Sequence, residues 1–289
     1  MSESEVVEER WGKSDATHDP CILAHFKPRA DDVLITTAPK AGTTWMQQIL
    51  HQLRSGGDDR FDSIDEVVPW LELPRQGKAW QQRLLEYDAI ASPRVFKTHC
   101  TFEQTPGGVD GAKIILSSRD PRDCCVSFYH HQMNMTNQAR KLTGRQAPAS
   151  FDEFFERWIE FAAWFRNVAS WWPHRQHHNV LWLRYEDMKA NFETSIDQIL
   201  DFLDWALSKE QKQRAMEFSS FAWMKQHADK FAARDAQGNS FFKAGKFIRK
   251  GEVGDYKTIL TPEHEAKIFA TACTYLPADA LAFFNIESK

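Results

Sequence analysis

A strand-loop-helix unit at residues 33–50 constrains the fold of this chain more than any other stretch. Apolar, β-prone residues lead into its loop, and a helix-forming run leads out of it. Backbone N–H groups in such a loop can turn toward an anion at the helix N-terminus, where Lys40 adds a positive charge and Thr43 and Thr44 add hydroxyl donors. Trp45 supplies a flat apolar face beside this position. The unit therefore predicts a phosphate-binding loop with an aromatic shelf for a base.

The loop differs from a Walker A motif in the position of its lysine. Lys40 comes two residues before Gly42, whereas a Walker A lysine follows the second glycine of its motif. An ordinary strand-to-helix turn with a surface lysine is the plain alternative for this stretch taken alone.

Charge and composition exclude several classes of function. The 289 residues are 42% hydrophobic and 26% charged, and the net charge of −4 argues against general nucleic-acid binding. Apolar runs stay short of the roughly 18 residues that a membrane helix needs. The five cysteines form no C-x-x-C pair. We therefore expect no signal peptide, no membrane span, no zinc site and a reducing, cytoplasmic environment.

The pattern along the chain predicts one domain of the α/β class. Residues 1–20 are polar and acidic and are expected to form a flexible leader to a domain at 21–289. Strands alternating with helices predict a central, mainly parallel sheet flanked by helices. The predicted strands lie at 33–37, 94–99, 113–118 and 180–184.

Two further segments have a predicted structure. Residues 134–149 are polar and rich in Asn, Thr, Gln, Gly and Pro, so we expect a mobile surface loop. Between Phe151 and Trp172, aromatic residues recur at three- and four-residue spacing, which predicts one continuous amphipathic core helix.

Three basic turns point to a ligand with two separated phosphate groups. They lie at Lys40 to Thr44, Arg119 to Ser127, and Arg249 to Gly251, and the first two follow predicted strands. In a parallel sheet such turns emerge at the same edge and can converge on one ligand. No acidic strand end stands out as a magnesium ligand, so a metal-free reaction is favoured.

His99 is the best candidate for a general base. It ends a predicted strand two residues after Lys97, so the two side chains share a face. An imidazole beside a lysine tends to stay neutral near pH 7, which suits proton abstraction. The histidine pairs at 130–131 and 177–178 are interpreted as surface or packing residues.

These residues together resemble the cytosolic sulfotransferase family, whose members transfer a sulfonate from 3′-phosphoadenosine-5′-phosphosulfate (PAPS) and release 3′,5′-ADP (PAP). The resemblance covers about residues 33 to 260 and implies a P-loop nucleotide-kinase-like fold. It assigns Lys40, Lys97 and His99 to catalysis. The residues that it assigns to PAPS are Lys40, Ala41, Gly42, Thr43, Thr44, Trp45, Arg119, Ser127, Tyr185, Ser219, Phe221, Phe247, Arg249, Lys250 and Gly251.

The implied reaction is in-line transfer to an acceptor hydroxyl. His99 takes the proton, Lys97 and Lys40 stabilise developing charge, and Ser127 holds Lys40 away until the acceptor binds. Ala41 stands where the family usually has a serine. The family's dimer motif, expected at 257–266, is matched only in part, so no dimer is inferred.

The acceptor is predicted only as a phenol, alcohol, sterol or glycolipid of small or amphiphilic character. The candidate residues of its pocket are Trp80, Phe128, Met133, Phe241 and Phe242. Two alternatives stay open at this point. One is a nucleotide-dependent kinase, and the other is a nucleotide-binding protein without catalysis.

Overall fold

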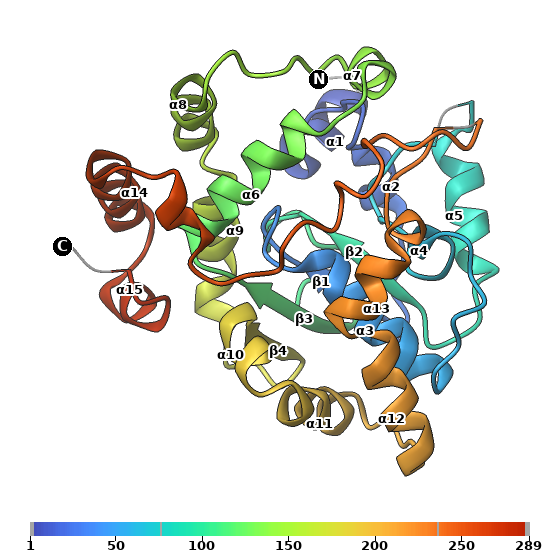
Figure 1. Ribbon diagram of the computed structural model, residues 1–289. Coiled ribbons are helices and arrows are strands. Elements are labelled where there is room, and N and C mark those ends of the chain that lie inside the picture. Colours follow the sequence, from blue (N-terminus) through green and yellow to red (C-terminus); the bar gives the residue numbers. More distant parts are fainter. Residues whose placement is uncertain (1–2, 76, 236, 287–289) are drawn as a thin grey trace.

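A four-stranded parallel sheet lies at the centre of the structure, with helices on both of its faces (Figure 1). The structure is a computed structural model, and it describes residues 3–75, 77–235 and 237–286. The strand order is β2-β1-β3-β4. The strands are β1 (Val33–Thr36), β2 (Val95–Thr98), β3 (Lys113–Ser118) and β4 (Val180–Arg184). The predicted α/β fold with a parallel sheet is confirmed, and each strand lies within one residue of its predicted bounds.

Two helices precede β1, further helices lie in the β1–β2 and β3–β4 connections, and the remaining helices follow β4. They are α1 (Glu3–Trp11), α2 (Pro20–His25), α3 (Thr43–Ser55), α4 (Ile64–Val67), α5 (Trp80–Asp88), α6 (Pro121–Met133), α7 (Asn137–Thr143), α8 (Phe151–Phe161), α9 (Ala163–Trp171), α10 (Tyr185–Ala190), α11 (Phe192–Leu203), α12 (Lys209–Phe218), α13 (Phe221–Gln226), α14 (Pro262–Tyr275) and α15 (Ala278–Phe283). Short 3-10 turns are η1 (Trp172–His174), η2 (Ala228–Lys230) and η3 (Asp255–Thr258). No described helix is long and apolar enough to cross a bilayer.

The central strand β1 is buried on both sides because its side chains alternate between two cores. Val33 and Ile35 pack with α3 and α11 on one face of the sheet. Leu34 packs with α2, α5 and Trp171 on the other face. A strand that is buried on both faces has a continuous run of apolar residues in its sequence, which is typical of parallel sheets.

A third core lies beside the sheet and joins α6, α8, α9, α14 and α15. The predicted continuous helix from Phe151 to Trp172 is broken here, because Ala162 adopts a left-handed conformation with φ of 50°. The break redirects the chain, so that Phe155 and Phe165 both face this core from two separate helices.

Two polar segments are more ordered than their composition predicts. Residues 3–11 of the expected flexible leader form α1, and Trp11 packs into the core that contains Leu34. Within 134–149, expected to be a mobile loop, residues 137–143 form α7. The hydroxyl of Thr136 caps this helix by accepting from the N–H of Ala139 at 3.1 Å.

The amino ends of the strands are fixed by a buried ion pair. Asp32 precedes β1 and Arg94 precedes β2, and both are fully buried. Their side chains form a two-bond contact, with Nη2 to Oδ2 at 2.6 Å and Nε to Oδ1 at 2.8 Å. This ion pair stabilises the amino-terminal edge of the sheet, which is the edge away from the polar loops. The opposite, carboxyl edge is left to the loops that carry the predicted site residues.

Candidate active site

The loop between β1 and α3 has a strained backbone. Lys40 and Gly42 both have positive φ, of 70° and 93°, and Gly42 immediately precedes the first turn of α3. A Cβ on Gly42 would lie 3.0 Å from the ring of Tyr185, so any other residue here would be crowded in addition to being strained by the positive φ. The carbonyl of Ala41 accepts a hydrogen bond from the Ser117 hydroxyl at 2.7 Å. The loop is therefore held open at a helix N-terminus, where backbone N–H groups attract an anion.

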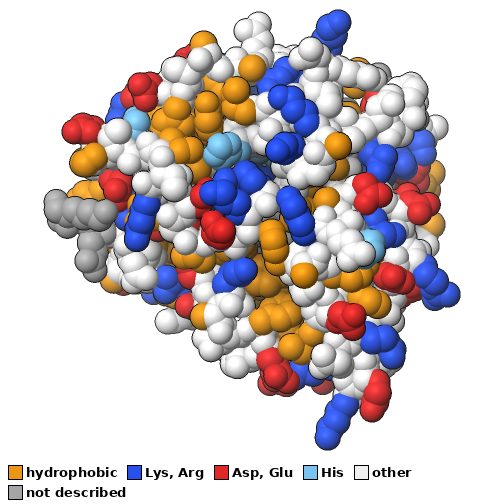
Figure 2. All heavy atoms as spheres, viewed as in Figure 1, with side chains coloured by type: hydrophobic (Ala, Val, Ile, Leu, Met, Phe, Trp, Pro, Cys, Tyr) orange, Lys and Arg blue, Asp and Glu red, His pale blue; other side chains and the backbone are white. Residues whose placement is uncertain are grey.

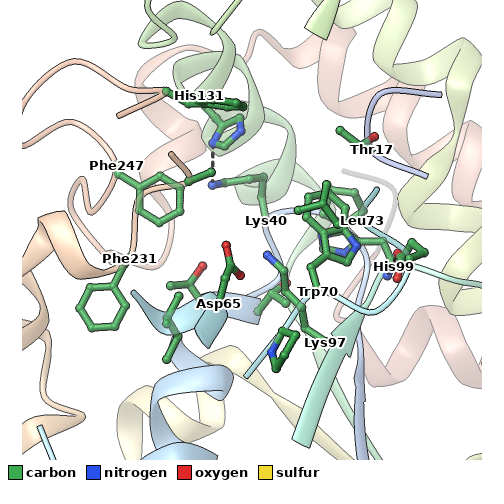
Figure 3. Close-up of a pocket in the computed structure, with 18 of the residues that line it drawn as sticks. Thr17, Lys40, Asp65, Trp70, Leu73, Lys97, His99, His131, Phe231 and Phe247 are labelled. Atoms are coloured by element: carbon green, nitrogen blue, oxygen red, sulfur yellow. Dashed lines mark hydrogen bonds between the residues drawn. The ribbon is translucent and has the colours of Figure 1, made fainter. Parts of the chain in front are cut away.

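Lys40 points from this loop to the end of α6, where it meets His131 (Figure 3). Its Nζ lies 3.2 Å from Nδ1 of His131 and 5.5 Å from the ring centre of Phe247. Burial, together with the charges of Lys97 and Arg119, lowers the pKa of Lys40 to about 8. The hydroxyl of Ser127, predicted to hold Lys40, lies one helical turn earlier on the same cavity wall, but the hydrogen bond of Lys40 goes to His131 instead.

His99 and Lys97 lie together at the carboxyl end of β2, as predicted from strand alternation. The Nδ1–H of His99 donates to the carbonyl of Thr37 at 2.7 Å, because a carbonyl can only accept. Burial and the charge of Lys97 lower the pKa of His99 to about 4. The ring is therefore neutral near pH 7, with its unprotonated nitrogen at Nε2.

Trp70 and Glu72 brace these two side chains. The Nζ of Lys97 lies 4.5 Å from the Trp70 ring centre, and the same indole packs edge-on against His99 at 5.2 Å. Glu72 is buried and accepts the backbone N–H of His99 at 2.9 Å. Sequence reasoning missed both residues, since they come from an irregular segment with no periodic pattern.

The second and third basic turns meet at the start of α6. Arg119 forms an ion pair with Asp123 at 3.2 Å, and Asp123 also accepts the N–H of Gly254 at 2.8 Å. Arg249 and Lys250 both pair with the carboxylate of Asp255, Lys250 at 2.7 Å. Arg119, Arg249 and Lys250 therefore do lie in one network, as predicted, and the carboxylates of Asp123 and Asp255 partly neutralise their positive charge.

Aromatic residues line the side of the cavity next to α3 and α13. Trp45 stacks on Phe192 at 5.4 Å and donates from Nε1 to the carbonyl of Ser219 at 2.8 Å. The hydroxyl of Tyr185 donates to the carbonyl of Gly251 at 3.1 Å. Phe221 lies against Gly251 and is 38% exposed. One face of Trp45 is thus covered, and Phe221 stands nearby as a second aromatic wall.

The cations, the two histidines and the aromatic residues described above line one large cavity of about 2210 Å³. Lys and Arg side chains gather around a hollow on this face of the molecule (Figure 2). Of the predicted donor-site residues, Lys40, Gly42, Thr43, Thr44, Trp45, Arg119, Ser127, Tyr185, Ser219, Phe221, Phe247, Arg249, Lys250 and Gly251 line the cavity. Ala41 is fully buried behind the loop.

The predicted acceptor pocket is only partly assembled. Phe128, Phe241 and Phe242 line the cavity. Trp80 instead stacks on His25 at 4.3 Å and packs against the core under α2, and Met133 lines a separate hollow beside α7. Neither side chain reaches the cavity, because Trp80 at the start of α5 faces α2 and Met133 at the end of α6 faces the hollow beside α7. Among the described residues, no three His, Cys, Asp or Glu side chains cluster as a metal site would.

Comparisons with known proteins bear on the family. Residues 30–273 match the profile of the family described as Sulfotransferase domain. The chain is 33% identical over 245 residues to mouse Sulfotransferase 1 family member D1, covering 82% of this chain and 80% of that protein. It is 31% identical over 245 residues to human Sulfotransferase 1E1, with the same coverage of both.

Solved structures agree with the fold. Mouse sulfotransferase SULT7A1 complexed with PAP is similar, with a TM-score of 0.73 and 24% identity over 91% of this chain and 90% of that one. Retinol dehydratase in a complex with retinol and PAP has a TM-score of 0.66 and 25% identity over 84% and 81%. The family profile spans well over half of the chain, and so this chain belongs to the sulfotransferase family that its motifs predict.

Proposed function

We propose that this protein transfers the sulfonate of PAPS to a hydroxyl of a small or amphiphilic acceptor, with His99 as the general base. The observation that carries the proposal is the tautomer of His99. Because Thr37 accepts the Nδ1 proton and the ring is neutral, Nε2 is the basic atom. His99 lines the same cavity as Lys40 and Lys97, so a hydroxyl deprotonated there would lie among cations that stabilise negative charge.

The residues at the sheet edge fit a donor with anionic groups at two ends. The loop at Gly42 leaves room that a Cβ would fill, and its helix N-terminus suits the 5′ end. Arg119, Arg249 and Lys250 suit the 3′-phosphate. PAPS supplies the sulfonate, whose bond to the 5′-phosphate oxygen breaks as a bond to the acceptor oxygen forms. Lys40 stabilises the charge left on that phosphate.

The rings next to the lysines support an acceptor with an apolar body. Phe128, Phe241 and Phe242 all line the cavity, and Trp70 packs against the proposed base. Aromatic walls bind flat apolar groups by burial and ring contacts. Phenols, alcohols, sterols and glycolipids are therefore the classes to screen. The cytoplasmic location implied by the resemblance stays a prediction.

The test compares wild type with His99→Ala, using radiolabelled PAPS and a panel of these acceptors, with PAP binding followed by calorimetry. Wild type should sulfonate at least one class without added metal. His99→Ala should lose transfer by about 10²-fold or more while PAP affinity changes little. Loss of PAP affinity in the variant would contradict the base role. Magnesium-dependent phosphoryl transfer from ATP, or PAP binding with no turnover, would favour the kinase or the non-catalytic alternative.

A further inference from the structure

The acceptor end of the cavity contains two polar side chains that the proposed reaction does not use. We call acceptor end the part bounded by His131 on α6 and by Phe242, next to the predicted donor-site residue Phe247. His131 packs on these rings at 4.5 and 6.1 Å, and Arg145, which follows α7, lines the same cavity. Arg145 is half-buried, and no carboxylate within the described ranges pairs with its guanidinium. A partly buried guanidinium without a partner is a candidate for binding a ligand.

The contact with Lys40 fixes which nitrogen of His131 carries a proton. A lysine ammonium can only donate, so Nδ1 of His131 must accept. Burial and the charges of Lys40 and Arg145 lower the pKa of His131 well below its usual value, so the ring is neutral and its proton is on Nε2. Nε2–H is then the polar group that the ring can offer a ligand, and the described residues provide no acceptor for it.

The acceptor end is therefore rich in donors and positive charge. Arg145 offers a planar fork of N–H groups, and His131 adds one N–H beside it. The anionic groups of the donor would balance Lys40 and the basic turns, whereas the charge of Arg145, which has no carboxylate partner within the described ranges, would stay unbalanced. An organic carboxylate matches such a fork in shape and charge.

From this arrangement we propose that the acceptor carries a carboxylate in addition to the hydroxyl that is sulfonated, and that Arg145 and the Nε2–H of His131 bind it. The inference rests on the proposed function, since it concerns the acceptor of the same reaction. The acceptor is thus a hydroxy acid with an aromatic or ring-shaped body between its two polar ends. Both residues recognise the acceptor and take no part in proton transfer.

The experiment uses 4-hydroxyphenylalkanoates with side chains of two to four carbons, and their methyl esters as neutral matches. Binding to the PAP-loaded protein is measured by calorimetry, and transfer is measured with PAPS. The best acid should bind wild type about tenfold more tightly than its ester, as expected for one charge-assisted contact. Arg145→Gln should remove this preference by raising KM for the acid, with kcat nearly unchanged, because the contact is remote from the reacting hydroxyl.

Charge reversal gives a gain that a merely structural role would not produce. Arg145→Glu should reject the acids and bind tyramine, the matching amine, more tightly than wild type does. Arg157→Gln is the control, since Arg157 is an exposed arginine paired with Glu153 on α8, and it should behave as wild type. Equal binding of acid and ester by wild type, or equal losses for both in Arg145→Gln, would overturn the inference. Failure of wild type to bind PAP would instead overturn the proposed function, and this inference with it.

Discussion

The charge of Lys40 should set the high-pH limit of the reaction. Burial and the charges of Lys97 and Arg119 lower the pKa of Lys40 to about 8 in the donor-free protein. A lysine with a lowered pKa is protonated below that value and loses its charge as the pH rises through it. Since the charged form stabilises the leaving phosphate, kcat/KM for PAPS should fall above pH 8.

The size of the fall follows from the fraction of Lys40 that is protonated. Roughly nine-tenths is charged at pH 7 and roughly one-tenth at pH 9, so kcat/KM should drop about tenfold between these values. Lys40→Arg keeps its charge throughout this range, so its kcat/KM should be lower in absolute terms but flat up to pH 9. The assay measures initial transfer rates from pH 6.5 to 9.5 to an aliphatic alcohol, which does not titrate there.

The control is Lys212→Arg, a lysine on α12 that pairs with Asp197 and lies outside the cavity lining. It should keep the wild-type fall above pH 8. A fall of the same midpoint and depth in Lys40→Arg would refute the assignment, because the titrating group would then be another residue. If kcat/KM of the wild type stays constant up to pH 9.5, the argument that burial and neighbouring cations lower the pKa of Lys40 is refuted.

Three other predictions test the stability of the fold and the donor site. Asp32→Asn removes the buried charge partner of Arg94 and leaves it only the exposed Asp88, 3.2 Å away, so it should lower the free energy of unfolding by about 3–5 kcal/mol in urea titrations; a loss below 1 kcal/mol would contradict a tight pair. Gly42→Ala forces a Cβ against Tyr185 at positive φ, so it should weaken PAP binding and cost about 1–3 kcal/mol of stability, and unchanged calorimetry would show that the loop adapts. Arg249→Ala should weaken PAP far more than ADP, which lacks the 3′-phosphate; equal weakening would remove Arg249 from that site.

The regular elements of this fold could be predicted because their signals are local. Apolar runs predict the strands, and the structure places each strand within one residue of its predicted bounds. Parallel strands bring their carboxyl ends to one edge of the sheet, so the sequence alone predicts that His99 and the loop at Lys40 lie together. The structure confirms these placements, whereas the roles of the residues await the experiments above.

The missed residues depend on contacts between distant segments. Trp70 and Glu72 lie in an irregular stretch, and only the folded chain brings them to His99. His131 did have a local signal. It lies four residues after Ser127 on the same helix, and residues at that spacing share a face. Reading the pair at 130–131 as surface or packing residues overlooked this spacing. The break at Ala162 had no such signal, because alanine rarely adopts positive φ.

The cations of the site share one further property, which bears on how the donor binds. Each main cation already has a partner inside the protein: Lys40 has His131, Lys97 has Trp70, and Arg249 shares Asp255 with Lys250. A phosphate that arrives therefore exchanges these contacts for its own, so each new contact contributes less affinity than a bare cation would give. The same partners hold the side chains near their working positions, which reduces the ordering cost of binding. Weakening one internal partner should therefore reduce competition for the cations but raise the ordering cost of binding. Asp255→Asn tests which of these two effects is larger. It removes the carboxylate that competes with the 3′-phosphate but also loosens Arg249 and Lys250. If competition with the phosphate dominates, PAP should bind Asp255→Asn more tightly than wild type. If the loss of ordering dominates, PAP should bind the variant more weakly. An affinity and a salt dependence that both stay unchanged would show that Asp255 does not hold the phosphate-binding side chains.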